Sequence, residues 1–172
     1  EKGPHGHADG TCHINVVCEE GDAWRDQIRS VVHYQTVAGG GVYMCSGALV
    51  NNTANDKTNY ILSAYHCQDL PVDITRFVVY FNYQTNTCIG NSGTHNNSVI
   101  GADIVAKFSA SDFMLMKLRT AIPDRYEVFY AGWTRSTGTP SIGAGIHHPG
   151  GDWKKISIPN RIQSSDANLW GV

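Results

Sequence analysis

The chain has 172 residues, and its 13 lysines and arginines nearly balance its 15 aspartates and glutamates, so the formal net charge is −2. This balance gives no electrostatic argument for a nucleic-acid or membrane-surface partner, and no apolar run is long enough to cross a bilayer. Eighteen glycines, few charges and abundant Val, Ile, Thr and Tyr favour strands and turns over helices.

Residues 1–11 are polar and contain His5 and His7. A His-x-His pair can bind a metal ion, but near a terminus it is more typical of a solvated tail. The polar start suits a mature protein whose leader has been removed. Five cysteines and three methionines favour an oxidising, extracellular compartment over a cytosolic protein with free thiols.

The alternation of apolar and polar residues predicts short strands separated by turns. A first short strand lies between Cys12 and Cys18. Further strands are predicted at residues 28–37, 42–50, 60–64, 77–84, 99–108 and 113–118, and then at residues 127–133, 142–148 and 154–158. Residues 51–59 form a polar loop, and residues 121–125 link the two groups of strands. This pattern predicts an all-β protein.

The most informative stretch is residues 63–67 (Ser-Ala-Tyr-His-Cys), because the apolar strand at 60–64 brings a histidine to its end. Cys67 can form a disulfide with Cys45, one strand earlier; this bridge closes a loop of about twenty residues and contributes about 3 kcal/mol. It would fix the imidazole of His66 at the rim of a β-structure. A general base must sit at such a rim to serve a hydroxyl nucleophile.

Residues 45–53 (Cys-Ser-Gly-Ala-Leu-Val-Asn-Asn-Thr) and 64–67 (Ala-Tyr-His-Cys) resemble the histidine segment of trypsin-like serine peptidases. Within that class, their sequence looks closest to that of the bacterial lysyl endopeptidases. The resemblance extends to residues 12–18, 20–26, 131–133, 145–149 and 155–157. It implies two antiparallel β-barrels with an active site in the cleft between them. Residues 1–120 would form the N-terminal barrel, and residues 121–172 the first part of a C-terminal barrel that is incomplete in this chain.

Asp112 directly precedes the apolar segment at 113–118 and resembles the aspartate segment of the same family. There the carboxylate orients the catalytic histidine, holds its useful tautomer and stabilises the imidazolium that forms during reaction. A turn aspartate at the start of a strand is the simpler interpretation, but the position downstream of His66 favours the catalytic one. The resemblance therefore implies that His66 acts as general base and then general acid, and that Asp112 orients it.

The resemblance also implies roles for other side chains. In the family's pattern Cys18 pairs with Cys88, which leaves Cys12 without a partner among these residues. Trp170 is a candidate for the family tryptophan that stacks beside the catalytic histidine.

Residues 90–93 (Gly-Asn-Ser-Gly) superficially match the Gly-x-Ser-Gly around a serine nucleophile. Trypsin-like peptidases require the order histidine, aspartate, serine, and this serine lies between His66 and Asp112. A loop rich in turn residues explains the tetrapeptide. After Asp112 the sequence contains no Gly-x-Ser-Gly-x-Pro segment, and the acidic residue expected at the floor of a lysine pocket is absent as well.

The absent serine, the half-built second barrel with its open strand edges and the unpaired Cys12 predict that the sequence is incomplete. A C-terminal remainder of the same protein would carry the nucleophile, either as a continuation or as a separate chain tethered through Cys12. The leading hypothesis is a secreted serine endopeptidase that acts on protein or peptide substrates through a His–Asp–Ser triad and an acyl-enzyme, without a cofactor. Cleavage after lysine is implied by the resemblance alone, and this chain by itself is expected to be inactive.

Two other classes of function stay open. A non-catalytic peptidase homologue would use the barrel as a protein-binding module, with His66 and Asp112 as relics of the fold. A histidine-based metal protein would bind its ion at the N-terminal histidines or at His147 and His148. Adjacent residues of a strand face opposite sides and cannot chelate together, so packing is the favoured role for this second pair.

Overall fold

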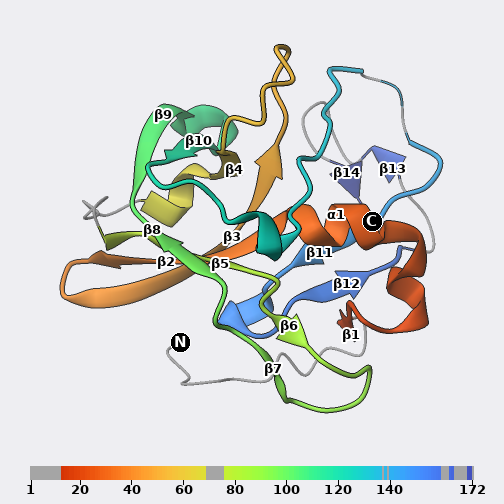
Figure 1. Ribbon diagram of the computed structural model, residues 1–172. Coiled ribbons are helices and arrows are strands. Elements are labelled where there is room, and N and C mark those ends of the chain that lie inside the picture. The colour runs from red at the N-terminus through yellow and green to blue at the C-terminus, as the bar shows by residue number, and fades with distance from the viewer. Residues whose placement is uncertain are drawn as a thin grey trace.

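The computed structural model describes residues 13–68, 76–136, 138 and 140–159, together with the backbone of residues 163–164 and 170–171. Its strands are β1 (Ile14–Asn15), β2 (Val31–Ala38), β3 (Gly41–Val50), β4 (Tyr60–Ala64), β5 (Val78–Phe81), β6 (Gln84–Thr85), β7 (Gly93–Thr94), β8 (Ser98–Ile100), β9 (Ala102–Phe108), β10 (Phe113–Leu118), β11 (Gly145–His147), β12 (Lys155–Ser157), β13 (Gln163–Ser164) and β14 (Trp170–Gly171). Its helical segments are α1 (Arg25–Ser30) and the short 3-10 helices η1 (Glu19–Trp24), η2 (Tyr65–Gln68), η4 (Ser109–Ser111), η5 (Asp124–Tyr126) and η6 (Pro149–Gly151). Strands dominate, as the composition predicts (Figure 1).

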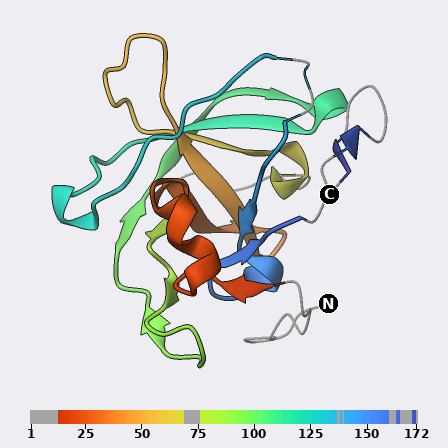
Figure 2. The same ribbon diagram turned by 90° about the vertical axis from the view of Figure 1, so that its right-hand side faces the viewer.

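Seven strands form one antiparallel sheet in the order β8-β5-β2-β3-β4-β10-β9, which curls into part of a barrel (Figures 1 and 2). Its two edge strands, β8 and β9, are consecutive in the chain and are separated by Gly101 alone. The Gly101 N–H donates to the Phe77 carbonyl (2.8 Å), and the Gly101 carbonyl accepts from the Arg119 N–H (3.1 Å). Gly101 has a φ of +89°, a conformation that favours glycine. The chain therefore connects the two edges of the sheet at this turn.

Large apolar side chains fill the interior of the curled sheet. Along β10, Met114 and Met116 are fully buried while the residue between them is only half-buried, which is the period of two expected for a strand. The buried cluster consists of Val32, Tyr34, Leu49, Ile61, Phe77, Val79, Phe81, Val99, Ala102, Met114, Met116, Leu118 and Tyr126. Burial of each large side chain contributes roughly 1.5–3 kcal/mol. This core holds the strands that lead to the candidate site.

A second, three-stranded sheet joins the beginning of the chain to its later part. Its order is β1-β12-β11, and Ile156 is paired with Ile14 on one side and with Ile146 on the other. Val16, Ile28 and Ile156 form its small buried core. Two further two-stranded pairs are formed by β6 with β7 and by β13 with β14.

The structure corrects several predicted strands. Residues 28–30 belong to helix α1, which turns Ile28 into the second core before strand β2 begins. Residues 127–133 form no regular strand, because Glu127 adopts a left-handed conformation (φ 49°) and only Ala131 then bridges to β3. The segment predicted at 99–108 is divided at the β8–β9 turn. Among the described residues, no helix is long and apolar enough to span a membrane.

Candidate active site

Pairing between β4 and β10 determines where His66 lies. The register of this antiparallel pair places Phe113 opposite Ala64 at one end of the ladder. Beyond that pair, the N–H of Tyr65 donates to the carbonyl of Asp112 (3.0 Å) and extends the ladder by one bond. The chain then enters η2, whose second residue is His66. Residues that are far apart in the sequence thus meet at one rim of the sheet.

The carboxylate of Asp112 binds His66 through both of its oxygens. Oδ1 accepts a hydrogen bond from the backbone N–H of His66 (2.8 Å), and Oδ2 lies 2.6 Å from Nδ1 of its imidazole. Asp112 adopts a left-handed conformation (φ 50°, ψ 37°), and its own N–H donates to the Ser109 carbonyl (3.1 Å). This turn directs the carboxylate toward the histidine rather than along strand β10.

The protonation states follow from these contacts. The hydrogen bonds from the backbone N–H and then from the imidazole of His66 lower the pKa of Asp112 below its ordinary value. Since an ionised carboxylate only accepts hydrogen bonds, Nδ1 of His66 carries a hydrogen and Nε2 of the neutral ring is an acceptor. The side chains of His66 and Asp112 are 64% and 51% exposed, so Nε2 is accessible to an external hydroxyl.

The disulfide predicted beside the histidine is present. Cys45 of β3 is bonded to Cys67 of η2, with 6.3 Å between their Cα atoms and a sequence separation of 22. Because Cys67 directly follows His66, this bond limits how far the imidazole can move away from β3. It provides a covalent support for the candidate site.

Replacing Cys45 and Cys67 together by alanine is expected to lower the free energy of unfolding by about 3 kcal/mol, because the unfolded chain regains the freedom of the closed loop. Urea unfolding of the oxidised protein measures this loss. Replacing Cys18 and Cys88 by alanine serves as the matched control. We expect the control to lose stability as well but to keep the His66–Asp112 hydrogen bond, and an unchanged unfolding midpoint for the first variant would contradict the account.

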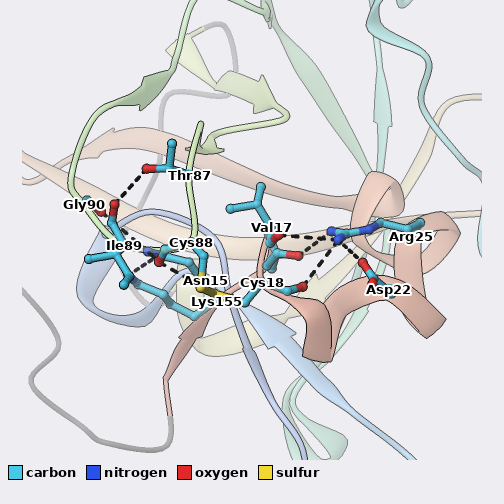
Figure 3. The surroundings of a disulfide bond; sticks show 11 residues. Asn15, Val17, Cys18, Asp22, Arg25, Thr87, Cys88, Ile89, Gly90 and Lys155 are labelled. Atoms are coloured by element: carbon cyan, nitrogen blue, oxygen red, sulfur yellow. Dashed lines mark hydrogen bonds and ion pairs between the residues drawn. A yellow bond between two sulfur atoms is a disulfide. The ribbon is translucent and has the colours of Figure 1, made fainter.

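The second predicted disulfide, between Cys18 and Cys88, fastens the start of the chain to the β6–β7 hairpin (Figure 3). The side-chain amide of Asn15 donates to the Cys88 carbonyl beside it (2.8 Å). Arg25 lies on the other side of the bridge, where its guanidinium donates to the carbonyls of Val16 (2.6 Å) and Cys18 (3.3 Å). The bridge belongs to the framework rather than to the site.

The Gly-x-Ser-Gly match at residues 90–93 lies in the loop of the same hairpin. The carbonyl of Ser92 accepts a hydrogen bond from the N–H of Asn86 (2.9 Å), which closes the turn. Gly93 lies so close to the partner strand that a Cβ on it would be 2.2 Å from the Gln84 carbonyl oxygen. The first three residues of the tetrapeptide thus belong to the loop, as their composition predicts, and Gly93 begins strand β7.

The other predicted residues are distributed as follows. His147 packs against His13 (ring centroids 5.1 Å apart), whereas His148 packs against His33 (5.2 Å), so the adjacent pair does face different neighbours. His5, His7, Cys12 and the side chain of Trp170 lie outside the described residues. Among the residues that are described, no group of three or more His, Cys, Asp and Glu side chains is arranged to hold a metal ion.

Sequence reasoning missed a buried cluster of basic side chains at strand β2. His33, His148 and Lys154 are 1%, 5% and 0% exposed. Burial lowers the pKa of His33 to about 4 and that of Lys154 to about 7, and it holds the pKa of His148 well below its ordinary value. Lys154 Nζ donates to the Ile28 carbonyl (2.8 Å), whereas neither ring nitrogen of His33 has a hydrogen-bond partner within the described residues.

A curled antiparallel sheet with a hydrogen-bonded His–Asp pair at its rim, and a disulfide beside the histidine, defines a protein of the trypsin-like serine peptidase class. Residues 6–170 match the family model of the lysyl endopeptidase C-terminal domain, and the chain belongs to this family. A lysyl endopeptidase from Pseudomonas aeruginosa is 35% identical over an alignment of 164 residues, and the alignment covers 89% of this chain and 35% of that protein. The chain thus spans about a third of the length of the curated relative it matches.

Proposed function

We propose that this chain carries the general base of a secreted serine endopeptidase that cleaves after lysine. The single observation that supports the proposal most strongly is the contact of 2.6 Å between His66 Nδ1 and Asp112 Oδ2, because it leaves Nε2 as the basic nitrogen. Membership of the lysyl endopeptidase family supports the reaction class. The two disulfides support an extracellular location.

In the proposed mechanism, Nε2 of His66 removes the proton from a serine hydroxyl as the oxygen attacks the scissile carbonyl. The imidazolium that forms lies beside the Asp112 carboxylate, which stabilises its positive charge. The imidazolium then gives this proton to the leaving amine, and an acyl-enzyme remains. In deacylation His66 activates a water molecule in the same way, and the serine is regenerated.

The proposal assigns the nucleophile to residues beyond this sequence. It is supported by the lack of a Gly-x-Ser-Gly-x-Pro segment after Asp112 and by the turn role of residues 90–93. We propose that this remainder completes the second barrel, which begins near residue 121, and that Cys12 bonds to it. The proposed division at residue 120 is supported by the seven-stranded sheet, whose strands all lie between residues 31 and 118.

The preference for lysine rests on the relative, which is a lysyl endopeptidase. The test is hydrolysis of three peptides that differ only in having Lys, Arg or Leu before one bond, by the protein that contains this chain. We expect cleavage after Lys and its loss in a His66→Ala variant. Cleavage that survives His66→Ala would contradict the proposed mechanism, and equal cleavage of all three peptides would contradict the proposed specificity.

A further inference from the structure

Ser46 lies where strand β3 separates from strand β4. The last backbone pair between these strands is Ala48 with Leu62, whereas pairing of β3 with β2 continues through Ser46, which is opposite His33. From Ala48 toward the disulfide, β3 therefore has a backbone-paired neighbour on one side only. This is the end of β3 that faces His66, so other interactions must hold the two strands together there.

Where the backbone pairing of β3 with β4 has ended, a side-chain hydrogen bond joins the two strands. The Ser63 hydroxyl of β4 donates to the carbonyl of Ser46 (2.8 Å). Since a carbonyl only accepts, that bond uses the single hydrogen of Ser63, and the buried Tyr34 hydroxyl donates to Ser63 Oγ (2.8 Å). Cys45, the neighbour of Ser46, adds the covalent link to Cys67. Ser46 is thus the fixed point on β3 to which the histidine-bearing strand is attached.

The later part of the chain binds Ser46 from another side. The backbone N–H of His148 donates to Ser46 Oγ (2.8 Å), and the His148 ring is buried against His33. Three residues on, Gly151 is packed so closely that a Cβ there would lie 2.7 Å from the Met44 sulfur. The segment 148–152 therefore sits directly on β3, at the two residues that adjoin Cys45 of the disulfide beside the candidate site.

These contacts matter because the imidazole of His66 is 64% exposed. Packing against neighbours does little to orient such a ring, so its direction depends on the backbone of residues 64–67 and on the carboxylate that binds it. That backbone is paired with β10 on one side and is attached to β3 on the other side through Ser63 and Cys67. A shift of Ser46 would thus change the direction of the Nδ1–H bond.

We propose that Ser46 is a positioning residue for His66. Through Ser46, the packing of segment 148–152 on β3 is coupled to the geometry of the His66–Asp112 pair. The inference rests on the proposed function, in which His66 is the general base. Ser46 acts through two different atoms: its Oγ receives the His148 amide, and its carbonyl receives the Ser63 hydroxyl. The rim that holds His66 is thereby supported by the seven-stranded sheet and by the segment that directly follows β11 of the three-stranded sheet.

The test is the tautomer of the neutral His66 imidazole in the 172-residue chain, read from the ¹⁵N chemical shifts of its two ring nitrogens. A hydrogen-bond acceptor beside one ring nitrogen keeps the hydrogen on that nitrogen. A correctly placed Asp112 carboxylate therefore enforces the Nδ1–H form. We expect the wild-type chain to show this form and Ser46→Ala to show the mixed tautomers of a free histidine. Ser46→Thr, which keeps the hydroxyl, should restore the wild-type spectrum.

Ser30→Ala is the control, because Ser30 is a serine whose hydroxyl likewise makes a hydrogen bond to the backbone, donating to the Gln27 carbonyl (2.7 Å), but it lies at the end of α1. It should keep the Nδ1–H form. If Ser46→Ala does not fold, Ser63→Ala replaces it, since that change removes the other bond of Ser46. A folded Ser46→Ala or Ser63→Ala chain that keeps the Nδ1–H form as fully as the wild type overturns the inference.

This measurement needs no nucleophile, so its outcome is separate from that of the proposed function. In the protein that contains this chain, Ser46→Ala should lower kcat with little change in KM, because the contacts of Ser46 are with Ser63 and His148 and act on the orientation of the general base. An unchanged kcat would count against the positioning role. Failure of the proposed function has a different signature, which is peptide cleavage that does not depend on His66.

Discussion

An Asp112→Asn variant is expected to lose about four orders of magnitude in kcat, with KM nearly unchanged. The asparagine amide is a donor as well as an acceptor, so it favours the tautomer in which Nδ1 of His66 accepts. Nε2 would then carry the hydrogen and could not take the proton of the serine. The variant also loses the negative charge that stabilises the imidazolium during the reaction. Steady-state kinetics on a lysine peptide, in the protein that contains this chain, measures the effect.

Asp103→Asn is the matched control for this prediction. Asp103 is likewise an exposed aspartate with a lowered pKa, but its partner is the guanidinium of Arg119 (2.5 Å) on the outside of strand β9. The same chemical change there should leave kcat within a factor of about two, because exposed ion pairs contribute little. If Asp112→Asn kept more than about a tenth of the wild-type kcat, Asp112 would not be the residue that orients His66.

The stability of the protein should fall steeply as the pH drops from 6.5 toward 4. The pKa of His33 is about 4 in the folded protein and near 6.5 in the unfolded chain, so the unfolded state binds more protons throughout this range. His33 alone is expected to account for about 3 kcal/mol. His148 acts in the same direction, because its pKa is lowered as well.

The surroundings of His33 do not offset this effect. The side chains that face the two buried histidines are Tyr80, Tyr83, His147 and Lys154. Asp152 faces them in two ways: its backbone carbonyl binds His148 Nδ1, and its carboxylate lies near Tyr83 and Lys155. The aspartates with lowered pKa values act in a different range, below their ordinary value of 3.8. Loss of stability above pH 4 is therefore a signature of the basic cluster.

Lys154 extends the same trend to alkaline pH. Its pKa is about 7 in the folded protein and 10.5 when unfolded, so stability should keep rising as the pH increases between these values. Urea unfolding at several pH values measures both ranges. A His33→Phe variant should lose the His33 part of the dependence between pH 4 and 6.5 and keep the part that comes from His148, while His95→Phe, at an exposed position, should retain the whole dependence. Equal dependence in the two variants would contradict the account.

The sequence predicted the local features of the site better than its long-range contacts. The alternation of residues 60–64 was enough to place His66 at the end of a strand. The position of Cys45 one strand before Cys67 indicated the first disulfide, and the family pattern gave the second. The meeting of His66 with Asp112 depends on pairing of β4 with β10 across 46 residues. No local pattern encodes that register, so before the structure it followed from the family resemblance alone.

Strand β2 explains why the basic cluster was missed. Its first four residues are all buried, because the barrel core covers one face and residues 148–154 cover the other. Alternation reveals only strands with one face in solvent, so it could not indicate that His33 is enclosed. Lysine is almost never fully buried unless it is paired, and the hydrogen bond from Lys154 to the Ile28 carbonyl of α1 stabilises its buried ammonium group. Helix α1 was itself not predicted.

The most direct test of the central claim is intact-mass spectrometry of the protein that contains this chain, before and after treatment with a fluorophosphonate probe. If His66 serves a serine nucleophile, the mass should rise by one adduct, and the labelled peptide should lie outside residues 1–172. The adduct should be lost in His66→Ala. A protein that takes up no probe, that is labelled at Ser92, or that is labelled equally without His66 would contradict the account.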